Sequence, residues 1–113
     1  MSIDNKLLIW NVARGVLKLY ILWLLDQRPM HGYEITKRVE RLIDVRLSPS
    51  IVYSFLYKLE KLGLIRGRRK RGQNVKMYTI TCKGCKVLRD LSNRLSSFLK
   101  ELSEEEDTSK SKD

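Results

Sequence analysis

Residues 48–65 read SPSIVYSFLYKLEKLGLI, and this stretch predicts a short helix with its own start and stop signals. Ser48 is a good N-cap residue, and Pro49 suits the first helical turn, where a missing N–H costs nothing. Gly63 suits the left-handed residue that follows the end of a helix. We therefore expect a helix over residues 49–62.

The predicted helix has two chemically different faces. The apolar residues spaced three and four apart must be buried, and they are Val52, Phe55, Leu56 and Leu59. The other face is polar, aromatic and basic, and it carries Ser50, Tyr53, Ser54, Tyr57 and Lys61. It has no carboxylate, although a solvated helix face normally mixes both charge signs. This asymmetry favours a polyanionic partner.

Basic charge is concentrated around and after this helix. The chain has 113 residues, enough for one small domain, and a net charge of +10. Residues 58–89 contain eleven basic side chains and one acid, Glu60. Such concentration favours nucleic acid or an anionic membrane surface over a small acidic substrate, which needs only one or two charges.

A β-hairpin is predicted directly after the helix. Residues 64–69 and 75–80 have strand character and flank Lys-Arg-Gly-Gln-Asn at 70–74, which suits a hairpin loop. A basic hairpin after a recognition-type helix is a wing, here residues 66–76. Its charges could merely solubilise a loop, but their single sign favours contact with phosphates or with a minor groove.

Two further helices are predicted on the N-terminal side. The first, over about residues 6–26, is apolar nearly all round between Val16 and Leu25. Such a helix needs more than one layer of cover, and a second subunit is the economical source, although the fold could also wrap it completely. A second helix begins at His31, with Glu34 placed as in a capping box, and together with residues 49–62 it outlines a helix-turn-helix.

The last predicted helix begins at Thr81 and carries an apolar seam. The seam consists of Leu88, Leu91, Leu95, Phe98 and Leu102. We expect a homodimer formed through this seam and through the first helix, including Leu8 and Val12. Residues 103–113 are acidic and Ser-rich and have no apolar side chain, so we expect a disordered tail after a folded domain of residues 1–102.

No metal, cofactor or catalytic site is predicted. Cys82 and Cys85 form a Cys-x-x-Cys pair, but a structural zinc site needs four ligands, and the single histidine, His31, is distant in sequence. No paired-carboxylate, Ser-His or phosphate-loop pattern is present, so the chain is not expected to be an enzyme. The longest apolar run, residues 19–25, is too short to span a bilayer. Together with the lack of a disulfide framework, this predicts a cytoplasmic protein without a membrane partner.

Four motifs occur in a specific order along residues 19–91. They are Met-His-Gly-Tyr-Glu-Ile at 30–35, Ser-Pro-Ser-Ile-Val-Tyr at 48–53, Leu-Glu-Lys-Leu-Gly-Leu-Ile at 59–65, and Tyr-Thr-Ile-Thr at 78–81 with Gly84. In these motifs the chain resembles the PadR-like transcriptional regulators. The resemblance implies a mainly α fold with a small β-hairpin (α+β), a winged helix-turn-helix with extra N-terminal and C-terminal dimerisation helices. It also implies a dimer that binds double-stranded operator DNA, usually as a repressor.

The same resemblance places the helix at 49–62 in the major groove and the wing on the flanking backbone or minor groove. With the basic residues nearby, the expected DNA contacts are Ser48, Ser50, Ile51, Tyr53, Ser54, Tyr57, Lys58, Lys61, Arg66, Arg68, Arg69, Lys70, Arg71 and Lys76. Multidrug-sensing members stack flat ligands on a tryptophan of the C-terminal helix. This chain has only Phe98 there, so a small-molecule effector has no support from the sequence.

Two other functions are compatible with these patterns. A winged-helix or chromatin-like protein that binds nucleic acid with little sequence preference would have the same basic wing. A winged-helix protein-interaction module would leave that wing without a nucleic-acid role. A regulator is distinguished from a non-specific binder if it binds its operator about 10³-fold or more tightly than random DNA.

Overall fold

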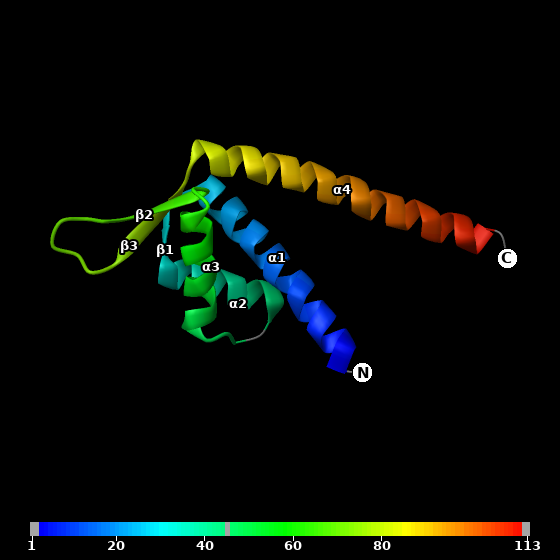
Figure 1. Cartoon of the computed structure of the whole chain (residues 1–113), viewed down its shortest axis with the longest axis horizontal. Coiled ribbons are helices and arrows are strands. Elements are labelled where there is room, and N and C mark those ends of the chain that lie inside the picture. Colours follow the sequence, from blue (N-terminus) through cyan, green and yellow to red (C-terminus); the bar gives the residue numbers. More distant parts are fainter. Residues whose placement is uncertain (1–2, 45, 112–113) are drawn as a thin grey trace.

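The computed structural model describes residues 3–44 and 46–111, and within them the chain forms four helices and one three-stranded sheet (Figure 1). In chain order the elements are α1 (Ile3–Gln27), β1 (Met30–His31), α2 (Gly32–Ile43), α3 (Pro49–Lys61), β2 (Ile65–Arg69), β3 (Lys76–Ile80) and α4 (Cys82–Ser111). The predicted fold class, mainly helical with a small antiparallel sheet in a winged helix-turn-helix, is confirmed.

The sheet contains one strand more than the sequence predicts. Strands β2 and β3 form the expected antiparallel hairpin, with Ile65 opposite Ile80 and Arg69 opposite Lys76. On the other edge of β3 lies β1, in the order β1-β3-β2, with Met30 opposite Tyr78. A two-residue strand shows no alternation of side chains, so no sequence pattern could have indicated it. It ties the wing to the start of α2.

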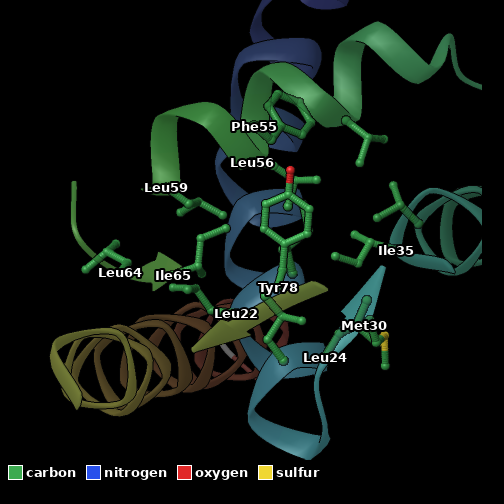
Figure 2. Packing of buried hydrophobic residues seen from close by; sticks show 14 of the residues in the cluster. Leu22, Leu24, Met30, Ile35, Phe55, Leu56, Leu59, Leu64, Ile65 and Tyr78 are labelled. Atoms are coloured by element: carbon green, nitrogen blue, oxygen red, sulfur yellow. The ribbon is translucent and has the colours of Figure 1, made fainter. Parts of the chain in front are cut away.

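The hydrophobic core lies where α1, α2 and α3 meet the sheet. Figure 2 shows Tyr78 of β3 pointing from the sheet toward Leu56 of α3, with Ile35 of α2 beside it. The face of α3 that was predicted to be buried is buried, at Val52, Phe55, Leu56 and Leu59. From α1, the core takes the C-terminal half only, at Leu17, Ile21, Leu22, Leu24 and Leu25.

Helix α3 ends at a turn that its glycine permits. Gly63 has a φ of +77°, and its N–H donates to the Glu60 carbonyl oxygen at 2.9 Å. The next N–H, from Leu64, donates to the Leu59 carbonyl oxygen at 3.0 Å. This pair of bonds satisfies carbonyls that the end of a helix would otherwise leave unpaired. The chain can therefore turn directly from α3 into the wing.

Helix α1 has the length and composition of a membrane span. Its residues Asn5–Gln27 have a mean hydropathy of 1.5. The uninterrupted apolar run at residues 19–25 is much shorter than this segment. The polar residues Asn11, Arg14 and Lys18 interrupt the apolar sequence, but they lower the mean hydropathy of the helix only a little. A core helix passes the same test, and the C-terminal half of α1 is packed inside the fold. We therefore interpret α1 as a core helix whose residues 5–12 are exposed in a single chain.

Helix α4 leaves the body of the fold after its first two turns (Figure 1). Thr81 caps it as predicted, because its hydroxyl oxygen accepts the Gly84 N–H at 3.0 Å. Residues 89–104 are exposed throughout. The radius of gyration is 17.0 Å, whereas a compact chain of this length has a value of about 13 Å. The projecting helix and the projecting wing account for the difference.

Two features of this helix differ from what the sequence patterns indicate. The disordered tail expected over residues 103–113 is helical as far as Ser111, and residues 112–113 lie outside the described part of the chain. Glutamate is a good helix former, and a helix that is already nucleated adds residues at little cost. Leu88, expected at the dimer seam, is instead buried in the core of a single chain.

The start of α4 gives a first testable prediction. A Cβ at Gly84 would overlap the backbone carbonyl oxygen of Leu64, which cannot move without displacing β2. We expect Gly84→Ala to lower the free energy of unfolding by about 1–3 kcal/mol, as overpacking usually does. Urea unfolding followed by circular dichroism measures the change.

The matched control is Gly15→Ala in α1, where an added Cβ meets nothing within 4 Å. There, the better helix propensity of alanine should raise the free energy of unfolding by up to about 1 kcal/mol. Equal effects of the two substitutions would show that the contact with Leu64 does not constrain the fold.

Candidate nucleic-acid interface

The exposed side of α3 divides into an outer row and two flanks. The outer row, as we name it, consists of Ser50, Ser54, Tyr57 and Lys61, all of them exposed. Tyr57 is 67% exposed, and the Lys61 ammonium lies 6.0 Å from the centroid of its ring. The outer row therefore presents hydroxyls, an aromatic ring and a cation to solvent, without a carboxylate.

The serines at the start of the outer row are already hydrogen-bonded within the helix. The Ser54 hydroxyl donates to the Ile51 carbonyl oxygen at 2.6 Å. The hydroxyls of Ser48 and Ser50 lie 2.8 Å apart, so Ser48 does not cap the helix through its side chain. These hydroxyl oxygens can still accept further hydrogen bonds from a partner.

One flank of α3 faces the wing, and Tyr53 lies on it rather than on the outer row. A Cβ added to Gly32 would come within 2.5 Å of the Tyr53 hydroxyl oxygen, so the ring covers the start of α2. Together with His31, Arg69 and Tyr78, Tyr53 lines a hollow of about 300 Å³ at the root of the wing. Tyr53, expected as a groove contact, is thus a packing residue that remains 44% exposed.

The same flank holds the wing in place through its one acid. The Glu60 carboxylate accepts the Gly67 N–H at 3.2 Å and lies 3.7 Å from the Lys76 ammonium. The isolated carboxylate of the basic segment therefore joins α3 to both strands of the wing. Lys76, expected as a DNA contact, is occupied by this ion pair.

The other flank of α3 faces α1. Ile51 is half-buried and packs against the core, so it lies beside the outer row and is not part of it. Lys58 is exposed on the same flank, and both residues line a hollow shared with Arg14 and Lys18 of α1. The two α1 cations are not predicted from the sequence, because they are separated from the basic segment by more than thirty residues.

The wing carries the remaining expected contacts. Arg66, Arg68, Arg69, Lys70 and Arg71 are all exposed, and none of them pairs with a carboxylate in the described part of the chain. Because side chains alternate along a strand, Arg66 and Arg68 share one face of the hairpin and Arg69 lies on the other. The wing therefore offers unpaired positive charge on both faces and at its tip.

The start of α2 closes the root of the wing. The Nδ1 atom of His31 lies 3.1 Å from the Lys76 carbonyl oxygen, and its backbone N–H donates to Glu34 at 3.3 Å. The Arg28 guanidinium lies 2.9 Å from the same carboxylate. The hydrogen bond from Arg28, and to a smaller extent the one from the His31 backbone, holds the pKa of Glu34 below its usual value. His31 thus lies at the N-cap of α2, where the sequence predicts it, and Glu34 bonds back to it as in a capping box.

The two cysteines lie at the start of α4 as free thiols. The Cys85 thiol donates to the Asp26 carboxylate at 3.7 Å, and burial together with this carboxylate raises the pKa of Cys85. A raised pKa makes a thiol a poor nucleophile and a poor metal ligand at neutral pH. Among the residues that the structure describes, no three His, Cys, Asp or Glu side chains converge as metal ligands would.

Large apolar side chains remain exposed on two helices. On the N-terminal half of α1 they include Leu7, Leu8, Ile9, Trp10, Val12 and Val16, and on α4 they are Leu91, Leu95, Phe98, Leu99 and Leu102. Apart from Leu88, every residue expected at the dimer interface is in this set. Leu7, Ile9, Val16 and Leu99 were not selected from the sequence.

The geometry agrees with a family of known regulators. Residues 21–90, which include α2, α3 and the whole wing, match the model of the transcriptional regulator PadR-like family. The chain belongs to this family. Because PadR-like proteins are DNA-binding transcriptional regulators, the prediction that the chain is not an enzyme is confirmed.

Solved structures of PadR-like and related regulators have the same fold. A proposed transcriptional regulator from Thermoplasma acidophilum is 33% identical, and the match covers 83% of this chain and 93% of that one with a TM-score of 0.70. A PadR-like regulator from Bacillus cereus is 28% identical over 81% of this chain and 95% of its own, with a TM-score of 0.68. A PadR family regulator from Eggerthella lenta shares the fold at 21% identity, covering 89% and 90% of the two chains with a TM-score of 0.73. Among curated proteins, none matches the chain significantly.

The contact between Tyr53 and Gly32 gives a second prediction. Gly32→Ala should displace the Tyr53 ring and lower the free energy of unfolding by about 1–3 kcal/mol. In a Tyr53→Ala background the same glycine substitution should cost at least about 0.5 kcal/mol less, because the obstructing ring is gone. A double-mutant cycle by urea unfolding measures this coupling.

A Tyr57→Ala background serves as the control, since Tyr57 lies on the outer row away from Gly32. The cost of Gly32→Ala should be unchanged there. A cycle with Tyr53 that showed no coupling would remove Tyr53 from the packing of α2 and return it to the set of groove residues.

Proposed function

We propose that this PadR-like regulator is a homodimer that binds a specific double-stranded DNA operator and represses transcription. The observation that supports the proposal best is the outer row of α3, which is exposed, has no carboxylate and lies next to an unpaired cationic wing. A major groove admits an α-helix and presents hydrogen-bonding groups and thymine methyls to it.

The outer row supplies side chains suited to reading bases. Ser50 and Ser54 are short and let the helix backbone approach the groove floor, where hydroxyls bond base edges or phosphates. Tyr57 lies about one turn beyond Ser54 along the helix, and Lys61 lies about two turns beyond it. Tyr53, Ile51 and Lys76 are held by packing or by an ion pair, so we assign them supporting roles at the edge of the groove.

The wing supplies affinity rather than sequence preference. Contacts to phosphates carry no sequence information directly, and each one releases condensed counterions. Among the residues that the structure describes, the wing arginines and Lys70 are exposed and have no carboxylate partner, which suits the flanking backbone or minor groove. A non-specific binder would have the same wing, so the outer row of α3 decides between the two functions.

The proposed dimer is supported by the apolar surface that one chain leaves uncovered. Leu91, Leu95, Phe98 and Leu102 extend along α4 beyond the body of the fold, and Leu8 and Val12 are exposed on α1. Dimeric helix-turn-helix proteins bind two half-sites one helical turn apart or a multiple of it, which matches a symmetric operator. We place the protein in the cytoplasm, with DNA as its partner and without a required effector.

Substitutions in the outer row give a third prediction. Ser50→Ala and Tyr57→Ala should leave the melting temperature nearly unchanged, because both side chains are exposed. Each should weaken operator binding by about 1–3 kcal/mol and weaken binding to random DNA by less. Fluorescence anisotropy at fixed salt measures both affinities, with an operator selected from random duplexes.

Arg68→Gln in the wing is the matched control, since it should weaken binding to both DNAs alike. If Ser50→Ala and Tyr57→Ala also weakened both DNAs alike, the non-specific alternative would be favoured. A large fall in melting temperature with DNA binding intact would instead assign these side chains to the core.

The dimer gives a fourth prediction. Sedimentation at micromolar concentration should show twice the chain mass of 13.3 kDa. Leu95→Asp should shift the protein toward monomer, because it places an unpaired charge in the apolar contact. Ser96→Asp, a like change on an exposed neighbouring residue of α4, controls for added charge. A wild-type monomer at this concentration would contradict the proposed assembly.

A further inference from the structure

A hollow of about 310 Å³ lies between the middle of α1 and the flank of α3 that faces away from the wing. Three cations line it, and they are Arg14, Lys18 and Lys58. Its apolar walls come from Trp10, Ile51 and Phe55, and Ser54 joins it to the outer row. None of the three cations pairs with a carboxylate in the part of the chain that the structure describes.

Lys18 of α1 packs against α3 within this cluster. Its ammonium lies 5.2 Å from the centroid of the Phe55 ring. Partial burial lowers the pKa of Lys18, and the nearby charges of Lys58 and Arg14 lower it further. Three like charges without a carboxylate repel one another, and a bound anion would remove that repulsion.

The hollow and the proposed dimer surface lie on different sides of α1. Trp10, Arg14 and Lys18 follow one another at intervals of four residues and form one row along the helix. A second row consists of Leu8, Val12 and Val16, and each of them precedes a member of the first row by two positions. Two positions correspond to a rotation of about 200° around the axis of a helix with 3.6 residues per turn, so the two rows lie on opposite sides of α1. A partner chain packed on the second row would leave the hollow accessible.

We propose that Arg14, Lys18 and Lys58 bind backbone phosphates of DNA on the side of the major groove opposite the wing. This inference deepens the proposed function and rests on it. In Figure 1, α3 lies between the wing and α1. A major groove about 12 Å wide is bordered by two phosphate backbones, so a helix inside it presents one flank to each. The wing contacts the phosphates of one backbone, and the cluster of Arg14, Lys18 and Lys58 contacts those of the other.

The test compares the salt dependence of DNA binding between wild type, Arg14→Gln, Lys18→Gln and the double variant. The logarithm of the binding constant falls with the logarithm of salt concentration by about 0.9 for each phosphate contact. Each single variant should therefore lose about 0.9 from this slope and the double variant about twice as much. The ratio of the wild-type binding constant to that of a single variant should therefore be about 3.5-fold smaller at 200 mM salt than at 50 mM salt.

The slope is measured by fluorescence anisotropy on a selected operator duplex and on a random duplex of the same length. Lys100→Gln is the matched control, because Lys100 is exposed in the C-terminal part of α4. Figure 1 shows this part of α4 projecting away from α3. It should leave the slope unchanged. Arg14 is exposed, so Arg14→Gln keeps the test valid even if loss of the Lys18 contact with Phe55 destabilises the fold.

Equal loss of slope on both duplexes supports the inference. An unchanged slope, or a change of base preference, overturns it. Stabilisation of wild type by millimolar inorganic phosphate, absent from the variants and accompanied by unchanged DNA slopes, would assign the cluster to a free anion and also overturn it. If no duplex is preferred by wild type, the proposed operator binding fails, while the slopes on random DNA still decide the role of the cluster.

Discussion

The close approach of α4 to the Leu64 carbonyl is the constraint on which the arrangement of this regulator depends. That carbonyl accepts the Thr81 N–H at 3.0 Å, and the Thr81 hydroxyl donates to the Gly63 carbonyl oxygen at 2.7 Å. Gly84 permits the contact because any side chain there would overlap the Leu64 backbone. The end of α3, the start of β2 and the first turn of α4 therefore meet at one point. The directions of α3, the wing and α4 are set together, so a dimer built on α4 would also set the spacing of the two proposed DNA-binding units.

Electrostatics divides the proposed DNA-binding surface into parts with different roles. In the segment from Lys58 to Arg89, the single carboxylate, Glu60, holds the wing against α3 and pairs with Lys76. The wing arginines and Lys70 have no carboxylate partner in the described part of the chain. The outer row has little charge and is suited to hydrogen bonding and aromatic contact, whereas its neighbours on both sides are cationic. This division is what a regulator needs, since phosphate contacts supply affinity and base contacts supply discrimination.

Much of this architecture could be predicted from local patterns. The bounds of α3, its buried face, the hairpin and the Thr81 cap depend on residues close together in sequence, and each is confirmed. The family follows from the motifs at 30–35, 48–53 and 59–65, and it is also confirmed. The helix over residues 103–111 was not predicted, because composition alone does not show that a helix which starts at Cys82 can continue into a polar segment. The DNA contacts, the dimer and the repressor role stay predictions.

Helical periodicity assigns residues to a face, because residues three and four apart must share one side of a helix. It cannot say which other element covers the edge of that face. Packing between distant segments made Tyr53 a partner of Gly32, placed Ile51 against the core, brought Arg14 and Lys18 beside Lys58, and buried Leu88 while leaving Leu91 exposed. Strand β1 likewise exists only because β3 offers it an edge. Local sequence thus decided which helices and strands form and which faces are apolar, whereas contacts between residues far apart in the chain decided which exposed side chains are free to meet DNA.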